Sequence, residues 1–416
     1  MVNPLVVVML VSVGASPNPN PEWDPAWANA ENPILSGHVE LTTRDTFVKA
    51  GESYFGPDGD WIIFQGVPVP AEGESPDRYY SMYVAGVKRD ESGAIVGLHE
   101  AFRVSKPGSS NTCGWAHPTK PYHFLFGSTT TVPSEEGQPG YQRGTSSYSW
   151  QFPRETEIVA SWIDPEFVTA EPEVPVNLFI GEPKPIFERD GYDAEGSWSY
   201  DARFILYTHV APPGDVREGD GDIWVYDTLS DVHTPLVTKP GYDGGPFFSP
   251  DAKRICYRSD RRGDKLLQVM VADLDYQNGT IVGIKNETQL TDNEHVNWAP
   301  FFTLDGKYLF YATSEMGHAN YEVFAVSTDT SIDPDVRPRL RITQARGFDG
   351  LPTFSPDGQW MMWTAQRGAL VEGEDRPSSQ IWAAKYDHEA FEKAYAAARK
   401  ALQDKKDQAA FESYEP

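Results

Sequence analysis

The sequence predicts an all-β fold, a six-bladed β-propeller closed by an N-terminal strand and followed by a C-terminal α-helix. Two observations predict it. A unit made of an apolar-aromatic run, a tight polar turn and a second apolar-aromatic run occurs six times, with turns at Asp58, Thr119, Asp201, Asp251, Asp305 and Asp357. The last copies follow one another at a period of about fifty residues, which is the signature of a repeat architecture.

Each unit is expected to form a propeller blade. In the unit from Thr234 to Asp273, four short extended runs follow one another, TPLVT, GPFFSPD, KRICYRS and LLQVMVAD. The turn after the second run begins at Pro250-Asp251, where proline presets one torsion and aspartate can accept a hydrogen bond from the backbone ahead. Four short antiparallel strands with aromatic and β-branched faces are typical of a blade.

The two ends of the chain are expected to meet in the last blade. A short strand directly precedes every aromatic pair except the first, which has only His38 to Asp45 upstream, and no strand follows the last unit, which ends at Ile381 to Asp387. Pairing Val39 to Thr43 with that last unit closes six blades. This arrangement leaves no open sheet edge, which removes an aggregation hazard.

Three segments flank the expected propeller of residues 36–387. Residues 1–15 hold a short apolar core followed by small residues, as in a signal peptide. We expect it to be cleaved, which makes the protein exported (periplasmic or secreted). However, no Lys or Arg precedes the core, and a buried strand or an uncleaved anchor are the alternatives. Residues 16–35 read as a Pro/Asn-rich tether, and residues 388–416 as an amphipathic helix and tail.

Composition excludes some partners. The chain has 35 Lys and Arg against 61 Asp and Glu, a formal net charge of −26. Such a chain repels phosphate backbones, so nucleic-acid binding is not expected. The acidity serves solubility or attracts cations or a basic partner. Cys113 and Cys256 are expected to be buried free thiols, and we expect a monomer without a transmembrane segment in the mature chain.

The repeats resemble the TolB-type, WD-like β-propellers. The resemblance is carried by Phe248-Ser249-Pro250-Asp251, by Phe354-Ser355-Pro356-Asp357-Gly358 and by Asp222 to Asp227, DIWVYD. It implies an exported protein that binds a protein partner in the cell envelope. The second unit departs from the pattern, since Trp115 to Lys120 replaces the usual turn. TolB proteins also carry an α/β domain before the propeller, for which the 16–35 tether is too short.

Strand order predicts two different rims. The hairpin turns of all blades lie on one rim and are uniformly tight; we call it the hairpin rim. The loops that lead into the inner strands share the opposite rim with the loops between second and third strands. This second rim, the loop rim, carries the long variable segments, where functional residues concentrate. These segments are Gln65 to Arg78, Gly127 to Tyr148, His209 to Gly221 and Gln366 to Ser379.

Candidate ligand-binding residues follow from aligning the units on their turns. The position eight residues before the turn is Asn or Asp in five units, at Asn111, Asp193, Asp243, Asn297 and Asp349, and Ala50 in the first. These side chains either cap the loop backbone or form an oxygen ring for a hard cation such as Ca²⁺. Two positions further on, Glu52 and Glu195 are not repeated, and they are the metal ligands if there is a metal.

Other candidates are less specific. His117 and His209 are expected near the loop rim, and Tyr141 in the long insertion is the best exposed aromatic for stacking on a sugar or peptide. The sequence lacks HExxH and GxSxG motifs, which argues against those metalloprotease and serine-hydrolase chemistries.

The expected function is therefore that of a non-catalytic, exported binding module that recognises a protein or peptide through the loop rim. The alternative is a carbohydrate-active lyase or hydrolase with channel-mouth carboxylates and a metal. A purely structural role in an envelope assembly is the third possibility. Fold alone does not separate the three.

Overall fold

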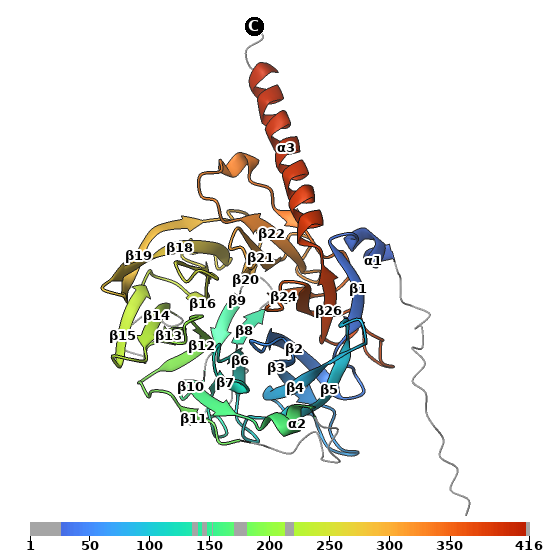
Figure 1. Cartoon of the computed structure of the whole chain (residues 1–416), viewed down its shortest axis with the longest axis vertical. Helices are drawn as coiled ribbons and strands as arrows, with labels where there is room; N and C mark the ends of the chain where they lie inside the picture. The colour runs from blue at the N-terminus through green and yellow to red at the C-terminus, as the bar shows by residue number, and fades with distance from the viewer. Residues whose placement is uncertain are drawn as a thin grey trace, which may run out of the picture.

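The structure, a computed structural model, describes residues 26–134, 140–143, 148–151, 153–169, 181–212 and 220–412. Within these residues, six four-stranded antiparallel sheets are arranged as blades around one axis, as Figure 1 shows. The predicted six-bladed β-propeller is confirmed. Each blade begins with its innermost strand, beside the axis, and ends with its outermost strand.

The first three blades run in chain order. Blade 1 contains β2 (Phe47–Phe55), β3 (Trp61–Pro68), β4 (Ser81–Arg89) and β5 (Ile95–Arg103). Blade 2 contains β6 (Asn111–Ala116), β7 (His123–Ser128), β10 (Glu157–Trp162) and β11 (Lys184–Pro185). Between β7 and β10 lies the separate hairpin of β8 (Gly140–Arg143) and β9 (Tyr148–Gln151). Blade 3 contains β12 (Tyr192–Trp198), β13 (Phe204–Val210), β14 (Gly221–Asp227) and β15 (Val232–Val237).

The last three blades complete the ring. Blade 4 contains β16 (Asp243–Phe248), β17 (Arg254–Ser259), β18 (Gln268–Gln277) and β19 (Thr280–Gln289). Blade 5 contains β20 (Asn297–Phe302), β21 (Tyr308–Thr313), β22 (Glu322–Ser327) and β23 (Leu340–Arg341). Blade 6 contains β24 (Asp349–Phe354), β25 (Trp360–Ala365), β26 (Gln380–Tyr386) and, from the start of the chain, β1 (Leu35–Glu40).

The apolar-aromatic runs form the core between adjacent blades. Each middle strand is buried on both faces because a neighbouring blade covers each side. Trp61, Ile63 and Met82 of blade 1, for example, share one cluster with Phe124 and Phe126 of blade 2. This double burial explains why the strands are almost continuously hydrophobic rather than alternating.

The predicted closure of the ring is confirmed. β1 pairs antiparallel with β26, with Leu35 opposite Tyr386 and Val39 opposite Ala383. β1 begins before the predicted range, which starts at Val39. The pairing continues past the end of β1 through backbone hydrogen bonds to Ile381. The N–H groups of Leu41 and Thr42 donate to the Ile381 carbonyl at 2.8 and 3.4 Å. The first and last strands of the described chain therefore share one sheet.

A buried ion-pair network, here called the clasp, reinforces this closure. The fully buried Arg367 donates to both carboxylate oxygens of Glu31, at 3.0 and 2.6 Å, and to Asp349 at 2.8 and 2.9 Å. Trp27 covers the guanidinium at 4.2 Å, and His38 bonds Glu31 at 2.7 Å. Glu31 ends helix α1 (Ala26–Glu31), which forms within the segment that the sequence suggests is a tether.

The hairpin turns repeat one set of hydrogen bonds. The carboxylate of the turn aspartate accepts the N–H group two residues ahead, as at Asp251 and Asp357, at 3.1 and 3.0 Å. The hydroxyl of Ser249 or Ser355, two residues earlier, donates to the same carboxylate. The predicted role of these aspartates is confirmed, and it leaves the hairpin rim compact.

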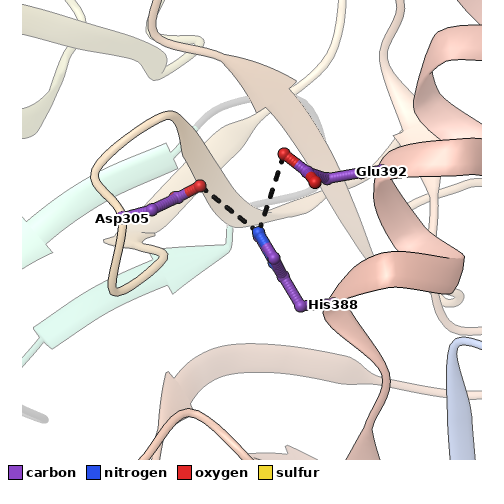
Figure 2. Close-up of side chains that lie close together, drawn as sticks. All are labelled: Asp305, His388 and Glu392. Carbon is purple, nitrogen blue, oxygen red and sulfur yellow. Dashed lines mark ion pairs between the residues drawn. The ribbon is translucent and has the colours of Figure 1, made fainter.

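The C-terminal helix α3 (His388–Glu412) is docked on blade 5 by its first turns, and Figure 1 shows its far end extending beyond the ring. Phe391 and Tyr395 are its buried residues, and Phe391 lies 5.1 Å from Phe310 between ring centroids. Figure 2 shows His388 between Asp305 and Glu392, at 3.3 and 3.8 Å. Among the helices that the structure describes, none combines the length and apolar character needed to span a bilayer.

We predict that Glu31→Ala lowers the free energy of unfolding by about 3–5 kcal/mol, because it leaves Arg367 buried with one of its two counter-ions missing. Denaturant unfolding measures the loss. Glu389→Ala, which removes an exposed i,i+4 pair with Lys393, is the control and is expected to cost less than about 0.5 kcal/mol. Equal losses in the two variants would contradict the stabilising role of the clasp.

We also predict that Phe391→Ala destabilises the protein by about 3–5 kcal/mol, because it empties a buried aromatic site between α3 and blade 5. The same substitution at Phe411, which is 68% exposed on the same helix, should change the stability by no more than about 0.5 kcal/mol. Thermal unfolding compares the two; a harmless Phe391→Ala would show that α3 is not docked as described.

Candidate functional site

The innermost strand of every blade contains a β-bulge close to the axis. Its pairing with the second strand shifts register at the same place in all six blades. One residue of each bulge has a positive φ, between 44° and 59°. These six residues, which we call the bulge ring, are Glu52, Cys113, Glu195, Gly245, Ala299 and Leu351. A non-glycine residue rarely adopts this conformation, so five such residues at equivalent positions mark a strained site.

The bulge ring forms the floor of a pocket. All six of its residues line a small cavity, and four of them also line a pocket of about 450 Å³ that adjoins it. The walls of this pocket come from residues that lead into the inner strands and from loops between second and third strands, including Tyr80, Thr156, Tyr192, Trp298, His318, Tyr321, Phe348, Gln366 and Arg376. The pocket therefore belongs to the loop rim.

Four aromatic side chains fill the channel just below the bulge ring. They come from the position two residues further along four inner strands, and we call them the aromatic plug: Tyr54, Trp115, Phe247 and Phe301. Neighbouring rings are 5.0 to 5.4 Å apart between centroids. Because these rings are packed against one another, the pocket ends at the plug and is entered from the loop rim.

Arg258 of β17 neutralises one of the two carboxylates on the floor. Its guanidinium donates to Glu195 Oε1 at 2.5 Å, and both side chains are less than a tenth exposed. Glu195 Oε2 accepts three further bonds, from the Tyr242 hydroxyl, the Thr208 hydroxyl and the Gly245 N–H, at 2.6, 2.7 and 2.6 Å. Glu195 is therefore fully hydrogen-bonded, as a buried charge must be to be tolerated.

Gly245 makes room for this ion pair. A β-carbon at this position would lie 2.0 Å from Arg258 Nη1, and the backbone φ of +59° also disfavours a side chain. The glycine in the bulge ring of blade 4 is thus what allows an arginine from the next strand to reach the axis.

Glu52 is the second carboxylate, and its environment is different. Its carboxyl group accepts a long hydrogen bond of 3.4 Å from the Tyr54 hydroxyl and one from the Cys113 thiol. Burial raises the pKa of Glu52 above its usual value, and the neighbouring Glu195 carboxylate raises it further. Both effects disfavour an isolated negative charge here. A ligand that donates hydrogen bonds or carries positive charge would relieve them.

The Cys113 thiol is a hydrogen-bond donor in this site rather than a nucleophile. Burial raises its pKa well above the usual value, and the carboxylates of Glu52 and Glu195 add to the increase. The thiol form therefore persists, and only the thiolate is strongly nucleophilic. Both cysteines are free.

The predicted Asn/Asp positions are buried and bonded mostly to side chains of their surroundings. Asp193 bonds His209, Asp243 bonds Arg261 and Asp349 bonds Arg367, each at 2.8 Å. Asn111 accepts from Ser128 at 2.7 Å, and Asn297 donates to Gln268 at 3.1 Å. Of the five, Asn111 lines the pocket. The three aspartates are therefore held by side chains rather than by the loop backbone that they were expected to cap, while Asn111 and Asn297 also donate to backbone carbonyl groups. A cation ring at these positions stays a prediction.

The histidine and tyrosine candidates do not gather in the pocket. His209 is buried against Asp193. His117 lies on the hairpin rim instead of near the loop rim, because it belongs to the turn between β6 and β7, at the position that Ser249 and Ser355 occupy in their blades. Its Nδ1 accepts the N–H groups of Thr119 and Lys120 at 3.2 and 3.1 Å, and burial lowers its pKa to about 4, so the ring stays a neutral acceptor. Tyr141 belongs to β8, but its side chain is outside the described part of the structure.

Arg258 is the functional residue that the sequence reasoning missed. A signal was present: seven residues after the turn, blade 4 has an arginine where blades 1, 3, 5 and 6 have Gln65, Thr208, Ala312 and Thr364. Cys113 was also missed, although it occupies the same aligned position as Glu52 and Glu195.

The floor offers few ligands for a metal. Ca²⁺ takes six to eight oxygen ligands, whereas both oxygens of Glu195 are already engaged by protein donors. Within the described residues, the set of three potential ligand side chains lies elsewhere, at Asp305, His388 and Glu392. The Lys307 ammonium already bonds Asp305 and Glu392 of that set, at 3.1 and 3.3 Å. A calcium ion at Glu52 and Glu195 stays a prediction.

We predict that Arg258→Met lowers the free energy of unfolding by about 3–5 kcal/mol at pH 8, because Glu195 becomes a buried carboxylate without a counter-ion. The double variant R258M/E195Q should recover part of the loss, because it also removes the charge of Glu195. Denaturant unfolding of both variants tests this, and an equal or greater loss in the double variant would contradict it.

Comparison with known proteins gives one sequence relative and several structural ones. No protein-family model matches the chain. The Tol-Pal system protein TolB of Wolinella succinogenes is 27% identical over 201 residues, and this match covers 46% of the chain and 41% of that protein. The chain thus spans less than half the length of this relative.

Two solved structures illustrate the structural similarity. TolB from Acinetobacter baumannii superposes with a TM-score of 0.47 at 17% identity, over 80% of this chain and 65% of that one. An oligogalacturonate lyase in complex with manganese superposes with a TM-score of 0.43 at 12% identity, over 84% and 91%. The chain is thus a six-bladed β-propeller closed by β1, and part of its sequence is similar to that of a TolB protein.

Proposed function

We propose that the chain is an exported, non-catalytic binding module that recognises a protein or peptide partner of the cell envelope through its loop rim. The observation that carries the proposal is the dead-end pocket, which opens on the rim with the long loops and stops at the aromatic plug. A pocket of this form accepts the tip of a partner, such as a side chain or a chain end, and cannot let a polymer pass through.

The sequence similarity supports a binding role. The relative is a Tol-Pal system protein, and the resemblance to the TolB type implies recognition of protein partners. The composition of the pocket agrees with this. Aromatic walls, including Trp298, Tyr321 and Phe348, supply contact area with little loss of side-chain entropy, and a few polar groups at the floor give specificity.

The alternative is a carbohydrate-active lyase or hydrolase. One observation favours it, because a carboxyl group with a raised pKa, as at Glu52, suits a general acid. A second group primed as a base is needed as well, and Glu195 is held by Arg258. A polysaccharide-cleavage screen tests this alternative, and cleavage that disappears in Glu52→Gln would replace the binding proposal.

We predict that filling the pocket abolishes partner capture. Ala319 is exposed and lines the pocket, so Ala319→Trp should block it without disturbing the core. The chain is immobilised, exposed to an envelope extract of its own organism, and the proteins that it retains are quantified. We expect at least a tenfold loss of the retained partner.

The control is Ala397→Trp, the same change at an exposed position of α3, a helix from which no residue lines the pocket. It should retain the partner as the parent chain does. Equal retention by Ala319→Trp and the parent chain would contradict recognition through this pocket.

A further inference from the structure

We infer that the pocket receives an alkylammonium group of a peptide, either a lysine side chain or a free amino terminus, with the Glu52 carboxylate as its counter-ion. The inference deepens the proposed function and rests on it. It follows from the charges, the hydrogen-bond donors and the shape of the pocket.

The charge of the floor favours a cation. Its charged side chains are two carboxylates, Glu52 and Glu195, and one guanidinium, Arg258, while Arg376 belongs to the wall of the pocket. Arg258 forms its ion pair with Glu195 at 2.5 Å, which leaves Glu52 outside that pair. A cation on the floor would act as the counter-ion of Glu52, whereas an anion would meet Glu52 and compete with Glu195 for Arg258.

The supply of hydrogen-bond donors on the floor also favours an ammonium group at Glu52. Glu195 has four donors at 2.5 to 2.7 Å, while Glu52 has the Tyr54 hydroxyl at 3.4 Å and the weak thiol donor of Cys113. The Glu52 N–H group is bonded to Thr364 and holds the bulge in place. The oxygens of Glu52 are therefore the under-bonded acceptors of the floor, and an ammonium brings three donors.

The wall above the floor suits the same kind of ligand. Aromatic side chains that line the pocket suit a cation on an aliphatic stem, since ring faces attract cations and the stem packs on apolar surface. The chain itself shows this tolerance. Lys49 Nζ lies 4.3 Å from the centre of the Tyr80 ring, and the Arg258 guanidinium lies 5.9 Å from that of Trp298; both rings line the pocket.

The closed channel and the net charge of the chain limit the form of the ligand. Because the aromatic plug closes the channel, an extended chain cannot thread through it, but the end of a side chain or of a polypeptide can reach the floor. The net charge of −26 attracts cations from a distance and raises their rate of association. A free metal ion is less suitable, because a single under-bonded carboxylate does not provide its coordination shell.

Three small probes test the inference. Nα-acetyl-lysine amide presents a side-chain ammonium, norleucine amide with a free α-amine presents a terminal ammonium, and Nα-acetyl-norleucine amide has neither. Binding to the full chain is followed by NMR or calorimetry. We expect at least one of the two cationic probes to bind about tenfold or more tightly than the neutral probe; the tighter one shows which source of ammonium the pocket prefers.

The variants tie the preference to Glu52. Glu52→Gln keeps the shape of the side chain and should abolish the preference for the cationic probes. Glu389→Gln removes the same charge from an exposed site on α3 and should keep it. Ala319→Trp should weaken all three probes by filling the pocket. Thermal unfolding establishes that each variant is folded. Should Glu52→Gln fail to fold, Glu52→Ala, which also removes the carboxylate, serves as the second variant and should likewise abolish the preference.

Three results would overturn the inference: equal binding of the neutral and cationic probes, a preference that survives in Glu52→Gln, or no binding of either cationic probe. Failure of the proposed function gives a different result. If partner capture is lost in Ala319→Trp but unchanged in Glu52→Gln, the pocket binds a partner through other chemistry; if neither variant affects capture, the proposed function itself is contradicted.

Discussion

The pairing of β1 with β26 is the constraint on which the rest of the structure depends. The hydrophobic core of a propeller lies mainly between adjacent blades, so each blade needs two neighbours to bury its two faces. In an open ring, blades 1 and 6 would each have one face exposed. The β1–β26 ladder and the clasp around Arg367 join segments at opposite ends of the described chain. With the ring closed, six inner strands converge on one axis and a pocket can form there.

The same six-fold repetition that builds the ring also builds the pocket. Each inner strand carries the same bulge, and each bulge presents one residue with a positive φ towards the axis. The architecture thus fixes six positions, and the sequence varies the side chain at each of them. In this chain they are two acids, a thiol and three small or apolar groups. Specificity arises where the repeats differ, at Glu52, Cys113, Glu195 and at Arg258 behind Gly245.

Much of the fold was predictable because its determinants are local or periodic. The turn aspartates, the aromatic runs and the unmatched first and last strands are visible in the sequence, and they led to six blades and to their closure. Glu52 and Glu195 were identified because they break the repeat. Arg258 was not, because its role depends on a contact with Glu195, 63 residues away in the sequence, and on a glycine that leaves space for it. The clasp was missed for the same reason, since Glu31 and Arg367 are 336 residues apart. His117 was misplaced because its ring nitrogen accepts the N–H groups of a turn from a position that serine occupies in other blades, a role that pattern alignment does not reveal.

The most direct test of the account is a crystal structure of the protein soaked with Nα-acetyl-lysine amide. We expect a closed six-bladed ring with the probe in the loop-rim pocket and its ammonium within about 2.7–3.2 Å of a Glu52 oxygen, while Arg258 stays paired with Glu195. An ammonium bound elsewhere, or a Glu52 carboxylate already paired with Arg258 in place of Glu195, would contradict it.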